Sequence, residues 1–163
     1  MKILLRTLLS LALIVWLGGE ILFPIVAQVT FTKLRPDTHT AGTIVGQVLR
    51  ILHGMGLVSG VFILAVLALA PAWGIARPRA ALAAMVLVLL MIACTVYSQF
   101  GIIPAMERDR LAAGGAIDTA DAENSLTAHF NRLHDRSEQV EGAILLLGLA
   151  TVVLVAWAET SKT

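Results

Sequence analysis

The sequence predicts an all-α integral membrane protein, an antiparallel four-helix bundle whose last helix extends beyond the bilayer. Three observations lead to this class. Apolar residues make up 58% of the chain and charged residues only 14%, whereas soluble domains average about 25% charged residues. Four long apolar stretches are each bounded by charge, and none alternates with the period of two typical of strands. A chain of 163 residues suffices for one domain but is too small to bury this apolar surplus in its own core.

The apolar stretches have the lengths that membrane spans require. A helix needs about 20 residues to cross the hydrocarbon layer, with a range of roughly 17–25. Within a single domain of residues 1–163, we expect spans at residues 7–32, 45–73, 80–104 and 137–158. The last apolar run is at the short limit, so its helix must begin upstream and draw Glu138 and Glu141 into the membrane interface.

The connections between the spans differ in length. The first connection is short and contains Pro36, and residues 77–79 form a tight turn. Residues 107–123 are the one sizeable polar loop. Between that loop and Glu141 there is no glycine or proline, and apolar residues recur at helical spacing. We therefore expect one long final helix, amphipathic outside the membrane and apolar within it.

The distribution of lysine and arginine gives a weak orientation. One side of a four-span topology holds Lys2, Arg6, Arg77, Arg79 and Lys162, and the other holds Lys33, Arg35, Arg108, Arg110, Arg132 and Arg136. The total number does not separate the two sides, but the first group is concentrated in very short segments. This concentration predicts that both termini are cytoplasmic.

Polar residues gather at one depth when the spans are threaded antiparallel. Gln28 ends the first span, His53 begins the second and Gln99 ends the third, all in the leaflet opposite the termini. The start of the fourth span lies in the same leaflet. Glu20 is roughly 12 Å deeper than Gln28, at 1.5 Å per residue. We expect a polar funnel on the non-cytoplasmic side. Its candidate ligand- or ion-binding residues are Glu20, Gln28, His53, Gln99, His134, Ser137, Glu138 and Glu141.

Each of the ionisable residues also has a purely structural interpretation. Carboxylates inside the membrane are usually functional, so Glu20 is a candidate proton or cation site. The alternative is a protonated glutamate that packs and forms hydrogen bonds. His53 is either a histidine that donates to a neighbouring helix or a ligand of a metal or haem. His134 and the following glutamates form either a metal site or a solvated helix face.

The sequence gives no cofactor by motif. The candidate metal ligands are His53, His134 and Glu141, for a divalent metal, and the two histidines are also candidate axial ligands of haem b. The single cysteine, Cys94, excludes an intramolecular disulfide and a cysteine-based zinc site. A net charge of +1 without a dense basic run argues against nucleic acid.

Small residues at helical spacing predict close helix packing. Gly56 and Gly60 form a small-xxx-small pattern within the second span, and Gly42 and Gly46 repeat the same spacing earlier in the chain. Because these glycines lie on a membrane helix with no strand before them, a phosphate-binding loop is excluded. The glycine faces are compatible with a homo-oligomer or with a membrane-protein partner.

Four segments of the chain resemble a known family. They are Glu20-x-x-x-Pro24-x-x-Ala27-Gln28, Arg50-x-Leu52-His53-x-Met55-Gly56, Pro104-x-Met106-Glu107-Arg108 and Phe130-x-x-Leu133-His134-x-x-Ser137-x-x-x-Glu141-Gly142. Together they resemble the transmembrane-protein-205-like family, whose bacterial members form domain of unknown function 4149. The resemblance covers residues 9–157 and implies a four-span protein of the bacterial-type inner membrane. It implies no particular reaction.

Three function classes remain from the sequence. The first is a non-enzymatic membrane protein whose funnel binds or passes a small cation, a proton or a metal. The second is an assembly or scaffold subunit that docks a membrane partner. The third is a b-haem or metal redox protein. An enzyme is the weaker expectation, because no Ser-His-Asp order, phosphate loop or cysteine pair is present in the sequence.

Overall fold

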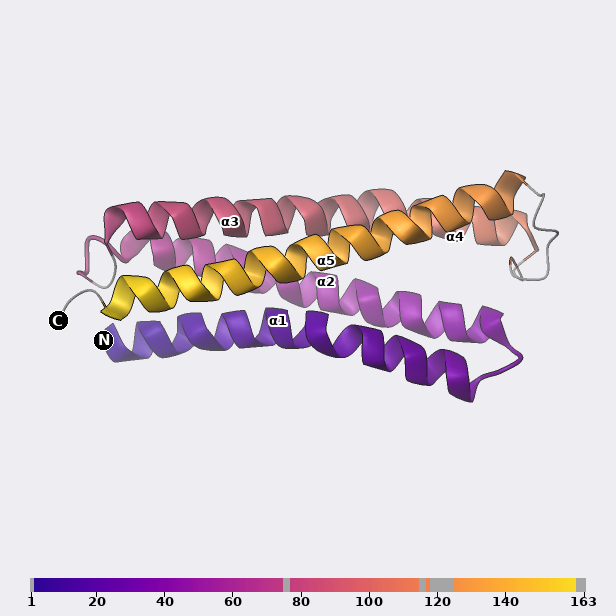
Figure 1. The fold of residues 1–163 in the computed structure, drawn as a ribbon, viewed down its shortest axis with the longest axis horizontal. Helices are drawn as coiled ribbons and strands as arrows, with labels where there is room; N and C mark the ends of the chain where they lie inside the picture. The colour runs from indigo at the N-terminus through magenta and orange to yellow at the C-terminus, as the bar shows by residue number, and fades with distance from the viewer. Residues whose placement is uncertain (1, 75–76, 115–116, 118–124, 161–163) are drawn as a thin grey trace.

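The computed structural model describes residues 2–74, 77–114, 117 and 125–160. Within them, four helical segments are long and apolar enough to cross a membrane. The helices are α1 (Lys2–Lys33), α2 (Thr38–Leu69), α3 (Pro78–Tyr97), the π-helical turn η1 (Ser98–Ile102), α4 (Ile103–Ala112) and α5 (Ser125–Thr160). They run side by side, with both ends of the chain at one end of the bundle (Figure 1). The predicted all-α membrane bundle is confirmed.

The helices differ from the expected spans mainly at their ends. Helix α2 ends at Leu69, four residues before the expected limit of its span. The third helical segment continues past its expected limit to Ala112, so residues 107–112, expected in the polar loop, are helical. Most of the rest of that loop, residues 115–116 and 118–123, lies outside the described residues. At 36 residues, α5 is about 54 Å long, well beyond the roughly 30 Å of hydrocarbon.

Local sequence explains where the helices begin and end. Asp37 caps α2 by accepting a hydrogen bond from the Thr40 backbone N–H at 2.9 Å. Pro78 occupies the first turn of α3, where a missing N–H costs nothing. Gly114, with φ of 76°, follows the end of α4 in the left-handed conformation that suits glycine. These signals place the turns at the two ends of the bundle.

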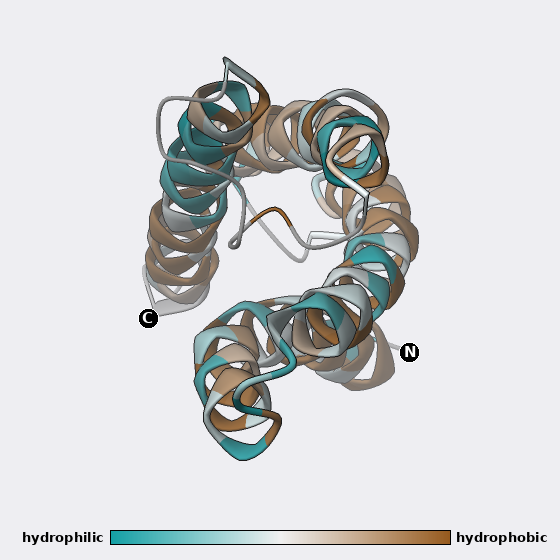
Figure 2. Ribbon diagram, turned by 90° about the vertical axis from the view of Figure 1, so that its right-hand side faces the viewer, coloured by the Kyte–Doolittle hydropathy of each residue, from teal (hydrophilic) through white to brown (hydrophobic). Residues whose placement is uncertain are grey.

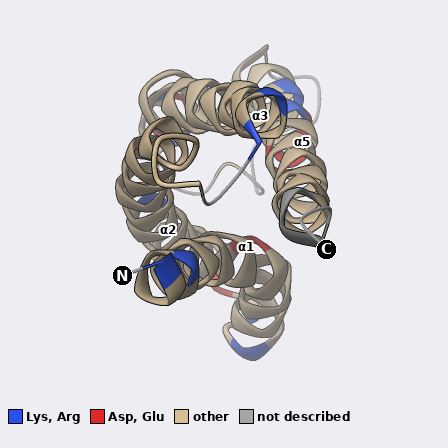
Figure 3. Ribbon diagram, turned by 90° about the vertical axis from the view of Figure 1, so that its left-hand side faces the viewer, with Lys and Arg blue, Asp and Glu red and all other residues tan. Residues whose placement is uncertain are grey.

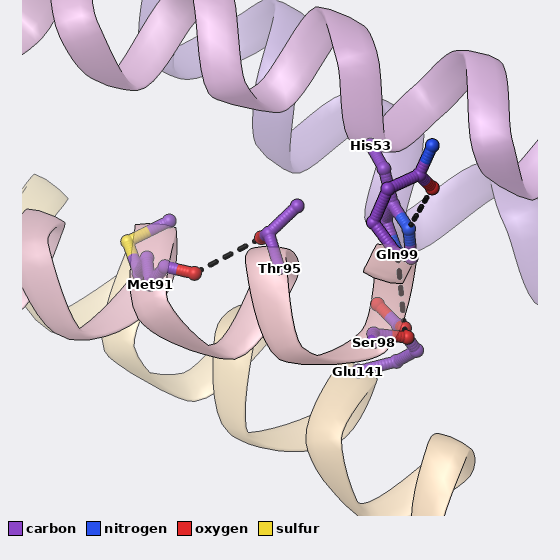
Figure 4. A network of polar contacts seen from close by, with 6 residues as sticks. All are labelled: His53, Met91, Thr95, Ser98, Gln99 and Glu141. Carbon is purple, nitrogen blue, oxygen red and sulfur yellow. Dashed lines mark hydrogen bonds and ion pairs between the residues drawn. The ribbon is translucent and has the colours of Figure 1, made fainter. Parts of the chain in front are cut away.

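A π-helical turn joins α3 to α4 without breaking the membrane segment. The backbone N–H of Ile103 donates to the carbonyl of Ser98, five residues earlier. Pro104 follows directly and has no N–H to complete a regular α-helical ladder. Proline therefore changes the hydrogen-bonding pattern here but does not end the helix. The turn begins at Ser98 and Gln99, two polar residues on the inner side of the third helix (Figure 4).

The apolar core occupies the half of the bundle that contains the termini. Trp16 is only 2% exposed and packs with Ile63, Met91 and Ile144, one from each of the other spans. Trp16 fits against α2 because Gly56 and Gly60 lack side chains. A Cβ at either glycine would lie 2.6–2.7 Å from its indole ring. This core closes the terminal half of the bundle.

In the opposite half the helices form an open ring. Consecutive helices pack closely, and α3 packs along α5, but α1 and α5 contact each other far less. The two helices diverge towards the polar end (Figures 1 and 2). Pro24 lies within the second half of α1, the half that diverges from α5. The divergence leaves space inside the ring at this end.

The outer surface of the bundle is apolar. Large exposed side chains cover every spanning helix, among them Ile14, Val58, Leu82, Leu89, Leu146 and Val153. At the end of the bundle that holds the termini, lysine and arginine lie at the helix ends (Figure 3). A surface of this kind is stable against hydrocarbon and not against water. The protein is therefore a multi-pass membrane protein that contacts the lipid bilayer.

Candidate functional site

A cavity of about 700 Å³ lies within the open half of the bundle. It is lined by the second half of α1, the first half of α2, α4, and the first half of α5. Most of its wall is apolar. The apolar lining residues are Phe23, Pro24, Ala27, Phe31, Val45, Leu49, Ile103, Met106, Ile117, Phe130 and Leu145. Seen from the polar end, hydrophilic segments surround the entrance and hydrophobic ones lie deeper (Figure 2). The size is typical of small-molecule sites.

A polar network lies at the inner end of this cavity. His53 on α2 is fully buried, and its Nδ1 and Nε2 atoms lie 3.0 Å from Gln99 Oε1 and from Glu141 Oε1 (Figure 4). The Ser98 hydroxyl donates to the same Glu141 oxygen at 2.8 Å. Glu141 Oε2 is buried without a hydrogen-bond partner. Three helical segments thus meet at one carboxylate.

The hydrogen bonds of His53 constrain its protons. When Gln99 presents its oxygen and Glu141 is ionised, both ring nitrogens donate and the imidazole is positively charged. When the amide is turned, its NH₂ donates to Nδ1, and the neutral ring still donates from Nε2 to Glu141. Gln99 therefore accommodates either charge state of His53, and an ionised Glu141 accepts in both.

Glu20 completes this network from α1. Its side chain is 7% exposed and lines the cavity. It interacts with the carboxyl group of Glu141 and with His53, the one basic group among the described residues that acts on it. The indole of Trp16 is close to the same carboxyl group but makes no hydrogen bond of good geometry. Glu141 contacts His53 directly, whereas Glu20 lies only within range of its charge.

A second group of polar residues lies at the entrance. His134 pairs with Glu138 at 3.3 Å, and both are exposed, at 54% and 71%. The His134 ring stacks on Phe130 with centroids 6.4 Å apart. Ser137 is buried and lines the cavity between this pair and Glu141. The structure therefore divides the α5 residues into a solvated pair and an inner carboxylate.

The remaining sequence candidates are not part of the network. Gln28 is exposed and does not line the cavity, and its backbone carbonyl accepts from Thr32. Gly42 and Gly46 line the cavity, and Gly46 has open space where a side chain would begin. Gly56 and Gly60 instead lie under Trp16, as described above.

Three residues that shape the site were not predicted from the sequence: Ser98, Glu107 and Arg110. For Ser98, the only indication in the sequence is that it precedes Gln99 in an otherwise apolar run. Arg110 lines the cavity, donates to Thr43 Oγ1 at 2.9 Å and pairs with Glu107 at 2.5 Å. Extending the third helix in register past Pro104 would have brought Glu107 and Arg110 onto its inner face.

The described residues do not present an evident metal site. No group of three or more histidine, cysteine, aspartate or glutamate side chains among them is arranged to hold a metal ion. Both nitrogens of His53 are occupied by Gln99 and Glu141, which leaves neither free to bind haem iron or a metal. His134 is engaged with Glu138 at the entrance. The candidate ligands His53, His134 and Glu141 are thus not arranged as one coordination sphere.

Comparison with known families gives one match. Residues 11–113 fit the family described as Domain of unknown function (DUF4149). The chain belongs to this family. The match includes α2, α3 and the residues that form the π-helical turn, but α5 lies beyond it, so the DUF4149 match alone does not account for Glu141. No curated protein and no solved structure matches the chain.

Proposed function

We propose that this DUF4149 protein binds a single proton or a small cation, each displacing the other, at Glu20 in the inner end of the cavity. One observation carries the proposal. Glu20 is buried, lines the cavity and lies near a second carboxyl group, Glu141, which takes the direct contact with the one nearby histidine, His53. With the three groups ionised, the cluster carries one uncompensated negative charge. A proton or a cation balances that charge, because an isolated carboxylate inside a membrane is costly.

The charges elsewhere around the cavity support this assignment. Glu107 is paired with Arg110, and Glu138, which lies 3.3 Å from His134, is 71% exposed and therefore solvated. Glu141 accepts from both His53 and Ser98. Glu20 is the carboxyl group left without a basic partner of its own. The added positive charge therefore belongs at Glu20 and not at the entrance.

The position of the core favours binding over continuous passage. Trp16, Leu17 and Met91 fill the bundle on the terminal side of Glu20, together with apolar residues of α2 and α5. A cation that reaches Glu20 from the polar end meets a packed apolar layer beyond it. In this conformation the cavity therefore ends at the carboxyl cluster.

Infrared spectroscopy tests the proposal directly. A protonated carboxyl group has a carbonyl stretching band that a carboxylate lacks, and this band shifts in heavy water. We expect purified protein in lipid nanodiscs to show such a band, which disappears as pH is raised. Glu20→Gln should remove it. Glu138→Gln is the matched control, because it removes a cavity glutamate that is already paired and exposed, and it should leave the band in place.

The outcome that contradicts the proposal is equally clear. If Glu20→Gln and the wild type have the same band and the same pH response, Glu20 does not hold the exchangeable proton. If the band responds to Glu141→Gln instead, the proton resides on the partner carboxyl group and the assignment within the pair is wrong.

The proposal extends to the protein's setting in the cell. We place the cavity on the non-cytoplasmic side of a bacterial-type inner membrane, with both termini in the cytoplasm. The support is the concentration of basic residues in the short segments near Lys2 and Arg79. Labelling of single cysteines by an impermeant maleimide in intact cells tests this orientation. A cysteine at Thr40 should be labelled, and one at Lys2 should not. The transmembrane-protein-205-like relationship belongs to the same proposal.

A further inference from the structure

The walls of the cavity restrict the kind of cation that it suits. Above the carboxyl cluster the lining consists largely of aliphatic and aromatic side chains, including Phe23, Leu49 and Met106. A small inorganic cation would have to give up its water shell there. Divalent cations in particular require several oxygen ligands at once. The described residues offer no such set around Glu20.

The volume of the cavity also exceeds what a single ion needs. About 700 Å³ lies within the range of roughly 300–1,000 Å³ that is usual for small organic ligands. Gly46 faces this space with no atom within 4 Å of the position that its Cβ would take. The empty volume therefore continues up to the backbone of α2. An organic body would contact the apolar walls and gain from leaving water.

The two helices on either side of the wider part of the ring also face the bilayer. α1 and α5 both line the cavity and diverge towards the polar end (Figures 1 and 2). The outward faces of both helices carry exposed apolar residues such as Ile25 and Leu146. A ligand with a hydrophobic body is compatible with these apolar walls and the lipid around them, whereas a hydrated ion is not.

We infer that the cavity binds a hydrophobic organic cation, with its positive charge against Glu20 and its apolar body against the walls. The inference rests on the proposed function and names the class of cation. Two independent features carry it: a carboxyl group more than nine-tenths buried that lacks a basic partner of its own, and an apolar cavity of matching size. Binding displaces the proton from Glu20, so affinity rises with pH.

Equilibrium dialysis with radiolabelled tetraphenylphosphonium tests the inference on the full chain in mild detergent. We expect saturable binding of one cation per protein. Glu20→Gln should weaken binding at least about tenfold, whereas Glu138→Gln should not. Unlabelled tetramethylammonium, which has the charge without the body, and triphenylphosphine oxide, which has a similar body without the charge, should each compete poorly.

A second pair of variants tests the cavity and not the charge. Gly46→Phe places a ring in the empty space without a clash at Cβ, and it should abolish binding while the protein stays folded. Gly54→Phe makes the same change on the same helix at an exposed position that also has open space. It should bind as the wild type does. Circular dichroism and size-exclusion chromatography establish that both variants are folded.

The results separate this inference from the proposed function. If the infrared band of Glu20 is present but tetraphenylphosphonium does not bind, the site holds a proton or an inorganic cation and the inference is overturned. Binding that survives both Glu20→Gln and Gly46→Phe also overturns it, because the cation then lies elsewhere. Equal competition by triphenylphosphine oxide would show that the charge is irrelevant.

Discussion

His53 on α2 and Glu141 on α5 are 88 positions apart in the chain, yet Nε2 of the histidine lies 3.0 Å from Oε1 of the glutamate. Ser98 donates to the same oxygen from the π-helical turn. Because His53 and Ser98 are fully buried, each depends on Glu141 for its hydrogen bond. The contact therefore joins three helical segments and fixes one oxygen of Glu141 at the inner end of the cavity.

Removing the acceptor should destabilise the bundle. Glu141→Ala leaves the His53 ring N–H and the Ser98 hydroxyl buried without a partner. We expect it to lower the free energy of unfolding by about 1–3 kcal/mol. Glu141→Gln should cost less, because its amide oxygen still accepts. Unfolding in mixed detergent micelles, followed by circular dichroism, measures the difference.

Glu138→Ala provides the comparison for this experiment. It is the same substitution one turn earlier on α5, at a side chain that is 71% exposed and paired only with His134. We expect a change within about 0.5 kcal/mol, as is usual for surface positions. Equal stability losses in the two variants would mean that Glu141 does not hold the three segments together.

The contact between Trp16 and the glycine face of α2 makes a second stability prediction. At Gly56 a Cβ would lie 2.6 Å from Trp16 Nε1, so Gly56→Ala forces the indole or the helix to move. We expect a loss of about 1–3 kcal/mol, the usual cost of overpacking. Gly54→Ala, with open space at its Cβ, should be neutral or stabilising by up to about 1 kcal/mol. Thermal unfolding in detergent distinguishes them, and identical midpoints would contradict the packing.

The fold follows from features that are local in sequence. Apolar length alone specifies four spans, and short connections force neighbouring helices to run antiparallel. That threading brings His53 and Gln99 to the same depth, so their proximity was predictable. Which residues of each helix face the cavity was not predictable in the same way. Gln28 and Glu20 are eight residues apart on one helix, but the second half of α1 diverges from α5, and Gln28 lies outside the cavity.

The composition of the site was less accessible from the sequence. A proline in a membrane helix suggests a kink or an end, but here the chain forms a π-helical turn and continues. That turn determines how Ser98 and Arg110 are oriented relative to the other helices, and no local pattern encodes it. Likewise, His134 and Glu141 share one face of α5, but only the bundle geometry decides that one lies at the entrance and the other inside.

The start of α2 should respond to pH. Hydrogen bonds from Thr40, from its side chain and its backbone N–H, hold the pKa of Asp37 below its ordinary value. A carboxyl group whose pKa is lowered by folding adds stability above its unfolded pKa, and this stability is lost as pH falls through the folded pKa. We expect the first turn of α2 to exchange its amide hydrogens faster once the pH is well below about 3.9.

Asp37→Asn separates this effect from general acid unfolding. Asparagine caps helices about as well as aspartate but does not titrate in this range. Hydrogen exchange of Thr40 and Ala41, followed by mass spectrometry, should therefore be independent of protonation in the variant once the intrinsic rate is corrected. A wild-type protein that behaves in the same way would show that the cap does not depend on ionisation.

Arg110 allows a test of the sign of the ligand's charge. It is the arginine that lines the cavity, and its pairing with Glu107 offsets one negative charge at the entrance. Arg110→Gln leaves Glu107 unpaired. A cationic ligand should then bind about two- to fivefold more tightly, as expected for an interaction of up to about 1 kcal/mol.

Arg108→Gln makes the same change in net charge at an exposed neighbour that does not line the cavity, and it should have little effect. Dialysis with tetraphenylphosphonium at low and high salt measures both, and the gain should shrink with salt because screening weakens exposed charges. Weaker binding in Arg110→Gln alone would contradict the predicted effect of the charge at Arg110.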